Sequence, residues 1–356
     1  MPHHLIFSEG QFGTPASKTA QSVIRYSARN VAAVLDSRVA GKTVQDVLGF
    51  GGGIPIVATV DQGIALGADS LMVGIAVAGS ELPAPARAAI ERAIEKGLHI
   101  WNGLHTFVAD DPVLGPSARE MGVDVHDVRR PPDDLPVGAG RVRNIDQTVV
   151  LAVGSDANIG KMTVMLQLRD AMKNSGKRVS FAPTGQTGIF IDGWGICVDA
   201  VVADFIAGAA EAVTLQAARD HDIVLVEGQG SILHPGYSGV SLGLLHGSLP
   251  HALIACHHST RRTFRHNDWL AIPPIDEVIA LHEALAHPLR PAKTIAVSLN
   301  TVELNGAEAR AEVKRVAQLT GLPTTDPVRF DPAPLVEALL QFDAERRAAL
   351  GAPVSV

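Results

Sequence analysis

The sequence predicts an α/β protein built from two doubly wound domains. Short aliphatic runs alternate with helical patterns along almost all of the 356 residues, which is the rhythm of parallel sheets covered by helices. Aromatic residues make up only 4% of the chain, a composition that suits buried aliphatic strands. The alternation stops once, in a proline-rich stretch around residues 129–143. We therefore expect one domain at residues 1–140 and another at residues 141–356.

Each domain contains several predicted elements. In the first, residues 85–96 form the clearest helix, and residues 130–138 have the composition of a linker. The predicted strands of this domain are residues 31–35, 56–58, 71–75 and 98–101. In the second domain the predicted strands are residues 149–153, 179–181, 223–226, 252–255 and 294–297. Its predicted helices are residues 160–174, 200–219, 276–286, 307–319 and 333–350, the last ended by Gly351.

A glycine-containing loop follows the strand at residues 149–153 and ends in Lys161 at the start of a helix. Backbone N–H groups, the positive end of the helix and the lysine ammonium together favour a bound phosphate. A chance glycine turn is the alternative, but strand, glycines, lysine and helix occur in the required order. The expected cofactor-binding residues in this loop are Gly154, Ser155, Asp156, Asn158, Ile159, Gly160, Lys161, Met162 and Thr163.

Two features distinguish this loop from the common phosphate loop. Five residues, not four, separate Gly154 from Gly160, and Met162 occupies the position where a hydroxyl normally holds magnesium. The loop is therefore expected to hold phosphates without activating a γ-phosphate. Thr163 could still contact a phosphate or, after a small shift, a metal ion.

Glu227 follows the predicted strand at residues 223–226. A carboxylate at the end of a parallel strand, next to the phosphate loop, points into the crevice where ligands bind. Glu227 is thus a candidate acid, base or metal ligand. The alternative is a glutamate that caps a helix or orders a loop.

Residues 183–195 read as a polar, glycine-rich loop that is too long for a simple connection. Its Thr184, Gln186 and Thr187 are candidate substrate contacts. Asp199 and Asp204 are expected at the start of the next helix, Asp199 as a second candidate base. Both aspartates could instead serve only as a helix cap and a dipole-facing acid.

Other candidates follow further predicted strands. Arg261 and Arg262 could clamp carboxylates or a phosphate, with solvated surface charge as the alternative. The neighbouring histidines and Cys256 fit no common zinc spacing, so no metal site is expected. Asn300 could read a nucleobase edge or cap a turn. His105 could reach a ligand cleft or be a plain surface histidine.

Composition and sequence motifs argue against several classes of function and partner. The net charge is −7 and no basic stripe carries interleaved aromatics, so nucleic acid is an unexpected partner. Residues 49–54 lack the third glycine of the dinucleotide fingerprint, which argues against NAD. No signal peptide or membrane span is expected. The two distant cysteines suggest no disulfide framework, and we expect a cytoplasmic setting.

The phosphate loop, residues 227–230 and Asn300 resemble the dethiobiotin-synthetase branch of P-loop proteins, which also has five residues between its loop glycines. A closer resemblance covers nearly the whole chain, through residues 103–105, 184–188, 199–200, 204–205 and 241–247. These motifs are similar to those of a two-domain P-loop family long described as of unknown function, one branch of which acetylates the amino group of D-glutamate. The resemblance implies a Rossmann-like N-terminal domain and a P-loop NTPase-like C-terminal domain.

The same resemblance implies an N-acetyltransferase that uses acetyl-CoA and an acidic amino acid, with D-glutamate as the expected substrate. The phosphates of acetyl-CoA could lie on the loop without a metal. Glu227 or Asp199 would accept the amine proton, and Lys161 or backbone N–H groups would stabilise the oxyanion. Arg261 and Arg262 are candidates for the substrate carboxylates.

Two alternatives remain open at this point. One is a magnesium-dependent ligase or kinase that uses ATP, with Glu227 on the metal. The other is a nucleotide-sensing module without turnover. In each case the partner is a small molecule, and a homo-oligomer is expected, with a dimer favoured.

Overall fold

The computed structural model describes residues 2–76 and 81–351, which form two compact units. The first unit extends to Pro132 and also contains Gln186–Ala200. The second comprises Asp133–Gly185 and the chain from Val201 onward. Each unit contains one six-stranded sheet, so the predicted α/β class is confirmed. No sequence pattern indicated that Gln186–Ala200 packs with the first unit.

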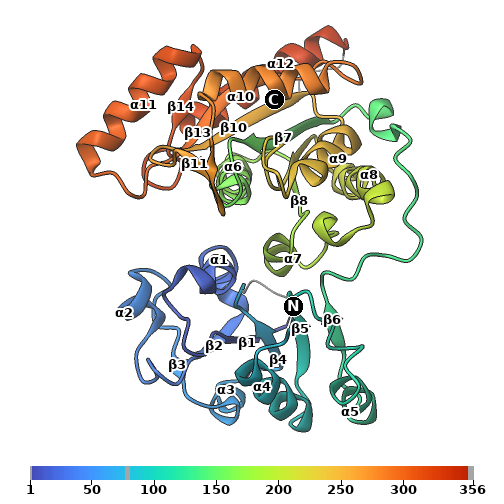
Figure 1. Ribbon diagram of the computed structural model, residues 1–356, viewed down its shortest axis with the longest axis vertical. Coiled ribbons are helices and arrows are strands. Elements are labelled where there is room, and N and C mark those ends of the chain that lie inside the picture. The colour runs from blue at the N-terminus through green and yellow to red at the C-terminus, as the bar shows by residue number, and fades with distance from the viewer. Residues whose placement is uncertain (1, 77–80, 352–356) are drawn as a thin grey trace. The chain divides into compact units, whose positions relative to one another are not determined.

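The sheet of the first unit has the strand order β3-β2-β1-β4-β5-β6 (Figure 1). All neighbouring strands are parallel, and the direction of winding reverses between β1 and β4. This is the order of a Rossmann sheet, in which the reversal opens a crevice at the carboxyl ends of the strands. The strands are β1 (His4–Phe7), β2 (Val31–Leu35), β3 (Ile56–Val57), β4 (Ser70–Val73), β5 (His99–Asn102) and β6 (Val125–Asp127).

Side-chain caps start two short helices of this unit. The Thr43 hydroxyl accepts from the Asp46 N–H while Asp46 accepts from the Thr43 N–H, and Thr59 and Gln62 repeat the arrangement. These bonds satisfy N–H groups that have no partner within the helix. The helices are α1 (Lys18–Ser27), α2 (Val44–Leu48), α3 (Val60–Ala65), α4 (Ala84–Glu95), α5 (Leu114–Glu120) and α7 (Gln186–Asp192).

The sheet of the second unit has the order β14-β13-β10-β7-β9-β8, again with parallel neighbours (Figure 1). β7 is buried along its whole length between β9 and β10, as expected for an aliphatic central strand. A separate antiparallel hairpin follows β10. The strands are β7 (Thr148–Gly154), β8 (Val179–Ala182), β9 (Ile223–Val226), β10 (Ala252–His258), β11 (Thr263–Phe264), β12 (Asn267–Ala271), β13 (Lys293–Asn300) and β14 (Thr324–Thr325).

Helices α8 and α9 of the second unit lie side by side (Figure 1). A Cβ on Gly247 would lie 2.1 Å from the carbonyl oxygen of Ala207, and a Cβ on Gly243 would lie 2.6 Å from Ile206 Cγ2. The glycines of residues 241–247 therefore permit close helix packing. The helices are α6 (Lys161–Asn174), α8 (Ile206–Ala218), α9 (Ser238–Ser248), α10 (Ile275–Ala286), α11 (Gly306–Thr320) and α12 (Ala333–Ala349).

Two predictions about local structure were wrong. Residues 183–195 are not one long loop, because α7 forms within them and buries Gly188, Ile189, Phe190 and Ile191. The helix predicted from residue 200 begins at Ile206. Asp199 and Asp204 instead belong to two separate 3₁₀ turns, Val198–Ala200 and Ala203–Phe205. In addition, Arg129, placed at the edge of a predicted linker, is buried.

Candidate functional site

The predicted phosphate loop lies in the second unit between β7 and α6. Asn158 and Gly160 adopt left-handed backbone angles, with φ of 54° and 112°. This turn leads the chain directly into α6, whose first residue is Lys161. The loop therefore lies against the positive end of a helix, which is a favourable place for an anion.

Lys161 is only 5% exposed, and its ammonium donates to the backbone carbonyl oxygen of Asp156 at 2.7 Å. Burial lowers the pKa of Lys161 to about 8. Gly228 makes room for the lysine stem, since a Cβ there would lie 2.9 Å from Lys161 Cδ and 1.8 Å from the Ala152 carbonyl oxygen. The loop thus encloses an ammonium that is mostly protonated at neutral pH.

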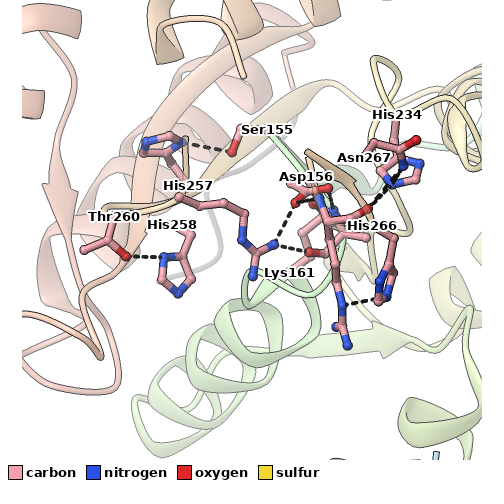
Figure 2. A network of polar contacts seen from close by, with 12 residues as sticks. Ser155, Asp156, Lys161, His234, His257, His258, Thr260, His266 and Asn267 are labelled. Carbon is pink, nitrogen blue, oxygen red and sulfur yellow. Dashed lines mark hydrogen bonds and ion pairs between the residues drawn. The ribbon is translucent and has the colours of Figure 1, made fainter. Parts of the chain in front are cut away.

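The buried carboxylate of Asp156 ties the loop to the segment after β10 (Figure 2). Its Oδ2 accepts from Arg261 Nη1 at 2.7 Å and from the Arg265 backbone N–H at 2.9 Å. Arg261 Nη1 also donates to the Ala157 carbonyl oxygen at 2.7 Å. Arg261, expected to hold a substrate carboxylate, is therefore part of the wall of the phosphate loop.

A second link joins the loop to β10. Ser155 Oγ lies 2.9 Å from His257 Nδ1, and the Ser155 N–H donates to the Cys256 carbonyl oxygen at 3.1 Å (Figure 2). Burial lowers the pKa of His257 to about 4, so its ring is neutral at pH 7. In the sequence, His257 was a candidate only for a zinc ligand. Its position at the end of β10, a strand predicted in the same sheet as the loop, was the sequence feature that could have indicated the contact with Ser155.

Glu227 lies at the end of β9 and is 4% exposed. Its Oε2 accepts from the backbone N–H groups of Thr184 at 2.9 Å and Gly185 at 3.1 Å. The Thr184 hydroxyl donates to the Glu227 carbonyl oxygen at 2.7 Å and accepts from Gln229 Nε2 at 3.1 Å. Two strand ends thus fix the orientation of the carboxylate.

The remaining predicted residues of this unit occupy less central places. Met162 and Thr163 lie in the first turn of α6 and are partly exposed, and Ile159 is buried. Arg262 is exposed and donates to the Ser259 carbonyl oxygen at 3.1 Å. The Asn300 side chain accepts from the Val302 N–H at 3.2 Å, which is the turn-capping alternative.

A second cluster belongs to the first unit and centres on the buried side chain of Arg129. Its Nε donates to the Gly103 carbonyl oxygen at 2.8 Å, its Nη1 to Asp199 Oδ2 at 2.7 Å, and its Nη2 to Gln186 Oε1. Desolvation and the neighbouring guanidinium lower the pKa of His105. Arg129 was not predicted as a site residue, because the proline-rich stretch that follows it has the composition of a linker.

Helix α7 packs on the first unit through two further contacts. The Thr187 and Thr19 hydroxyls lie 3.1 Å apart, and a Cβ on Gly103 would lie 2.8 Å from Phe190 Cε2.

The predicted site residues fall into two groups, one in each unit. Lys161, Glu227, Thr184 and Arg261 belong to the second unit, whereas Asp199, Gln186, Thr187 and His105 belong to the first.

Neither group is arranged as a metal centre. Within residues 2–76 and 81–351, His, Cys, Asp and Glu side chains do not gather in sets of three or more that could hold a metal ion. None of the helices in these ranges combines the length and the apolar character that crossing a membrane requires.

Comparison with known families explains the two units. Residues 37–131 match the family model described as a domain of unknown function (DUF1611_N), Rossmann-like domain. Residues 136–336 match the model described as a domain of unknown function (DUF1611_C), P-loop domain. A crystal structure of a DUF1611 family protein from Anabaena variabilis is 34% identical, with a TM-score of 0.89, and the match covers 96% of this chain and 100% of that one.

Two curated relatives have an assigned activity. A protein of Tritonibacter scottomollicae named D-glutamate N-acetyltransferase is 38% identical over 282 residues, which is 79% of this chain and 84% of the relative. A protein of Pseudoalteromonas sp. with the same name is 37% identical over 273 residues, covering 76% of this chain and 81% of the relative. The chain therefore belongs to the DUF1611 family, with an N-terminal Rossmann-like domain and a C-terminal P-loop domain.

Proposed function

We propose that this protein is a D-glutamate N-acetyltransferase that takes its acetyl group from acetyl-CoA. The observation that carries the proposal is the 37–38% identity to two enzymes of that name across at least 76% of the chain. The phosphate loop gives the proposal a physical basis, because acetyl-CoA presents a pyrophosphate and a 3′-phosphate to which such a loop is suited.

The loop supports binding of the donor without a metal. The ammonium of Lys161 and the start of α6 supply positive charge, while the side chain of Met162 has no oxygen with which to hold magnesium. Acyl transfer needs no γ-phosphate activation, so the reaction does not require a hydroxyl at the position of Met162. An ATP-dependent reaction would normally use that hydroxyl.

The reaction requires one proton to leave the substrate ammonium before its nitrogen can attack the thioester carbonyl carbon. We assign that proton to Glu227, whose carboxylate is held in a fixed orientation by the Thr184 and Gly185 N–H groups. The new C–N bond forms and the C–S bond breaks, and the second proton on the nitrogen passes to the departing sulfur, so that CoA leaves as the thiol. Backbone N–H groups would stabilise the oxyanion between these two steps, since Lys161 is assigned to the donor phosphates.

Asp199 has a different assignment in this proposal. Its carboxylate is paired with Arg129 at 2.7 Å, and the same guanidinium bonds Gln186 and the Gly103 backbone. The carboxylate is therefore engaged in holding Arg129 in place. We therefore assign Asp199 a positioning role that holds Gln186–Ala200 on the first unit. Exposed Arg262 is the candidate for the substrate carboxylates.

The assay that tests this function follows CoA thiol release from acetyl-CoA with D-glutamate, L-glutamate and D-aspartate, each with and without EDTA. We expect release with D-glutamate, insensitivity to EDTA, and a product with the mass of N-acetylglutamate and D configuration by chiral chromatography. No thiol release with any of these amines, or ADP formation when ATP and magnesium are supplied with an acid, would contradict the proposal.

We also propose that the enzyme works in the cytoplasm as a dimer. The thiols of Cys197 and Cys256 are both buried, which suits a reducing compartment. Two-fold dimers are the commonest assemblies of soluble enzymes. Light scattering coupled to size-exclusion chromatography would test the dimer, and a mass near the 37.4 kDa of a single chain would contradict it.

A further inference from the structure

The hairpin formed by β11 and β12 is hydrogen-bonded to the phosphate loop. The Arg265 backbone N–H donates to Asp156 Oδ2 at 2.9 Å, and the Arg265 carbonyl oxygen lies 2.9 Å from His234 Nε2 (Figure 2). Asn267 Nδ2 also donates to that carbonyl oxygen at 3.3 Å, and Phe264 is 1% exposed. The hairpin is therefore a fixed extension of the loop.

Strand β12 of this hairpin carries an exposed aromatic side chain. Trp269 on β12 is 76% exposed, more than any other large apolar side chain in the part of the chain that the structure describes. An isolated apolar residue on a surface needs no explanation by itself. This one, however, is a flat aromatic surface on a rigid element joined directly to an anion-binding loop.

Two arginines, Arg261 and Arg265, belong to the segment that contacts the loop. Arg261 uses Nη1 for Asp156 and Ala157, and Arg265 uses Nε for His266 Nε2 at 3.2 Å. Within the described residues, Nη2 of Arg261 and both terminal nitrogens of Arg265 have no hydrogen-bond acceptor. These N–H groups are available to a phosphate.

The chain geometry limits how far Trp269 can lie from the loop. Trp269 follows Arg265 by only four residues, and an extended chain spans at most about 3.6 Å per residue, so their Cα atoms lie within about 14 Å. Arg265 itself touches the loop through Asp156. A ligand that combines phosphates with a flat base could therefore contact both.

We propose that the hairpin is the subsite for the 3′-phosphoadenosine end of acetyl-CoA, with Trp269 stacked on the adenine and the Arg265 guanidinium on the 3′-phosphate. This inference rests on the proposed function and adds a basis for recognising CoA: ATP has no 3′-phosphate for Arg265 to bind. Adenine stacks on indole irrespective of hydrogen-bond pattern, which suits an open surface.

Tryptophan fluorescence gives a direct readout, since the chain has three tryptophans and only Trp269 is on the hairpin. Acetyl-CoA should quench the emission of the wild type and of Trp194→Phe, but much less that of Trp269→Phe. Trp269→Phe keeps an aromatic face and should bind acetyl-CoA within a few-fold of the wild type by calorimetry. Trp269→Leu should weaken binding by about 5- to 150-fold, the range for loss of one base stack.

The 3′-phosphate provides the second test. The wild type should bind acetyl-CoA at least about 10-fold more tightly than 3′-dephospho-acetyl-CoA, as expected for a hydrogen bond to a charged group. Arg265→Gln retains the backbone N–H that holds Asp156 but should erase most of this preference. The matched variant Arg143→Gln removes another exposed arginine and controls for the loss of one positive charge.

The outcomes separate this subsite from the proposed function. If the wild type turns over acetyl-CoA while Trp269→Leu keeps normal affinity, the subsite is wrong and the function stands. Quenching that follows protein concentration instead of acetyl-CoA would identify Trp269 as a contact with a second copy and would also overturn the subsite. If the wild type does not bind acetyl-CoA at all, both proposals are wrong. Melting curves of the variants would exclude unfolding as the cause of any loss.

Discussion

The ammonium of Lys161 donates to the backbone carbonyl of Asp156, five residues earlier in the same loop, at 2.7 Å. Burial holds the pKa of this lysine at about 8 instead of 10.5. An anion bound in the loop would stabilise the protonated form, so the charge of Lys161 links donor affinity to pH.

Acetyl-CoA affinity should fall as the pH rises through about 8. Lys161 is charged below this pH in the free protein and must take up a proton to bind the anion above it, so the dissociation constant should rise by up to about tenfold per pH unit. Calorimetry at pH 7, 8 and 9 measures the effect, and acetyl-CoA has no free thiol to complicate it. Lys161→Ala should bind about 1.5–3 kcal/mol more weakly at pH 7 and lose this pH dependence.

Replacement of Glu227 tests the assigned base. Glu227→Gln preserves the shape of the side chain but removes most of its ability to accept a proton, so turnover should fall about 10²- to 10⁴-fold with little change in acetyl-CoA affinity. Steady-state kinetics and calorimetry separate these effects. Asp199→Asn is the matched control and should be milder. Near-normal turnover of Glu227→Gln together with an inactive Asp199→Asn would reverse the two assignments.

Arg129 should be a strong stabiliser of the first unit. Arg129→Met leaves the acceptors Gly103, Asp199 and Gln186 without their donor, which should lower the free energy of unfolding by about 1.5–3 kcal/mol. Urea unfolding followed by circular dichroism measures this loss. Arg130→Met removes the neighbouring exposed arginine and should change stability by at most about 1 kcal/mol. Equal effects of the two variants would argue against the Arg129 cluster as an anchor.

Buried histidines should make the fold sensitive to mild acid. Burial lowers the pKa of His4, His257 and His282 to about 4 and that of His251 to about 3. The unfolded chain takes up these protons near pH 6.5, so stability is present above that pH and is lost as the pH falls toward 4. Each histidine contributes up to about 1.4 kcal/mol per pH unit. Urea unfolding at pH 7, 6 and 5 should show this decline, and His251→Gln should make it shallower. A constant unfolding free energy over that range would refute the assignment.

The sequence predicted those elements whose pattern is local. Aliphatic runs located β7 and β9, and the order of glycine and lysine located the loop before α6, because burial and anion binding leave a direct mark on neighbouring residues. The place of Glu227 directly after β9 was predicted for the same reason, and its role in the site stays a prediction.

The remaining features depend on partners far apart in the chain. Glycines at positions 185, 188, 193 and 195 made α7 resemble a loop, although its buried Ile and Phe residues pack on the first unit. Arg129 meets Asp199 across 70 positions, and Asp156 meets Arg261 across 105. Such pairings follow from tertiary packing, and nothing in the spacing of the residues indicates them.

The most direct test of the account is calorimetry of the wild-type protein with acetyl-CoA and with ATP, each in the presence of magnesium and of EDTA. The loop built around Lys161 and Met162 predicts that acetyl-CoA binds with the same affinity in both buffers and that magnesium does not strengthen ATP binding. Binding of ATP that requires magnesium, with no heat from acetyl-CoA, would contradict the assignment of this loop to an acyl donor.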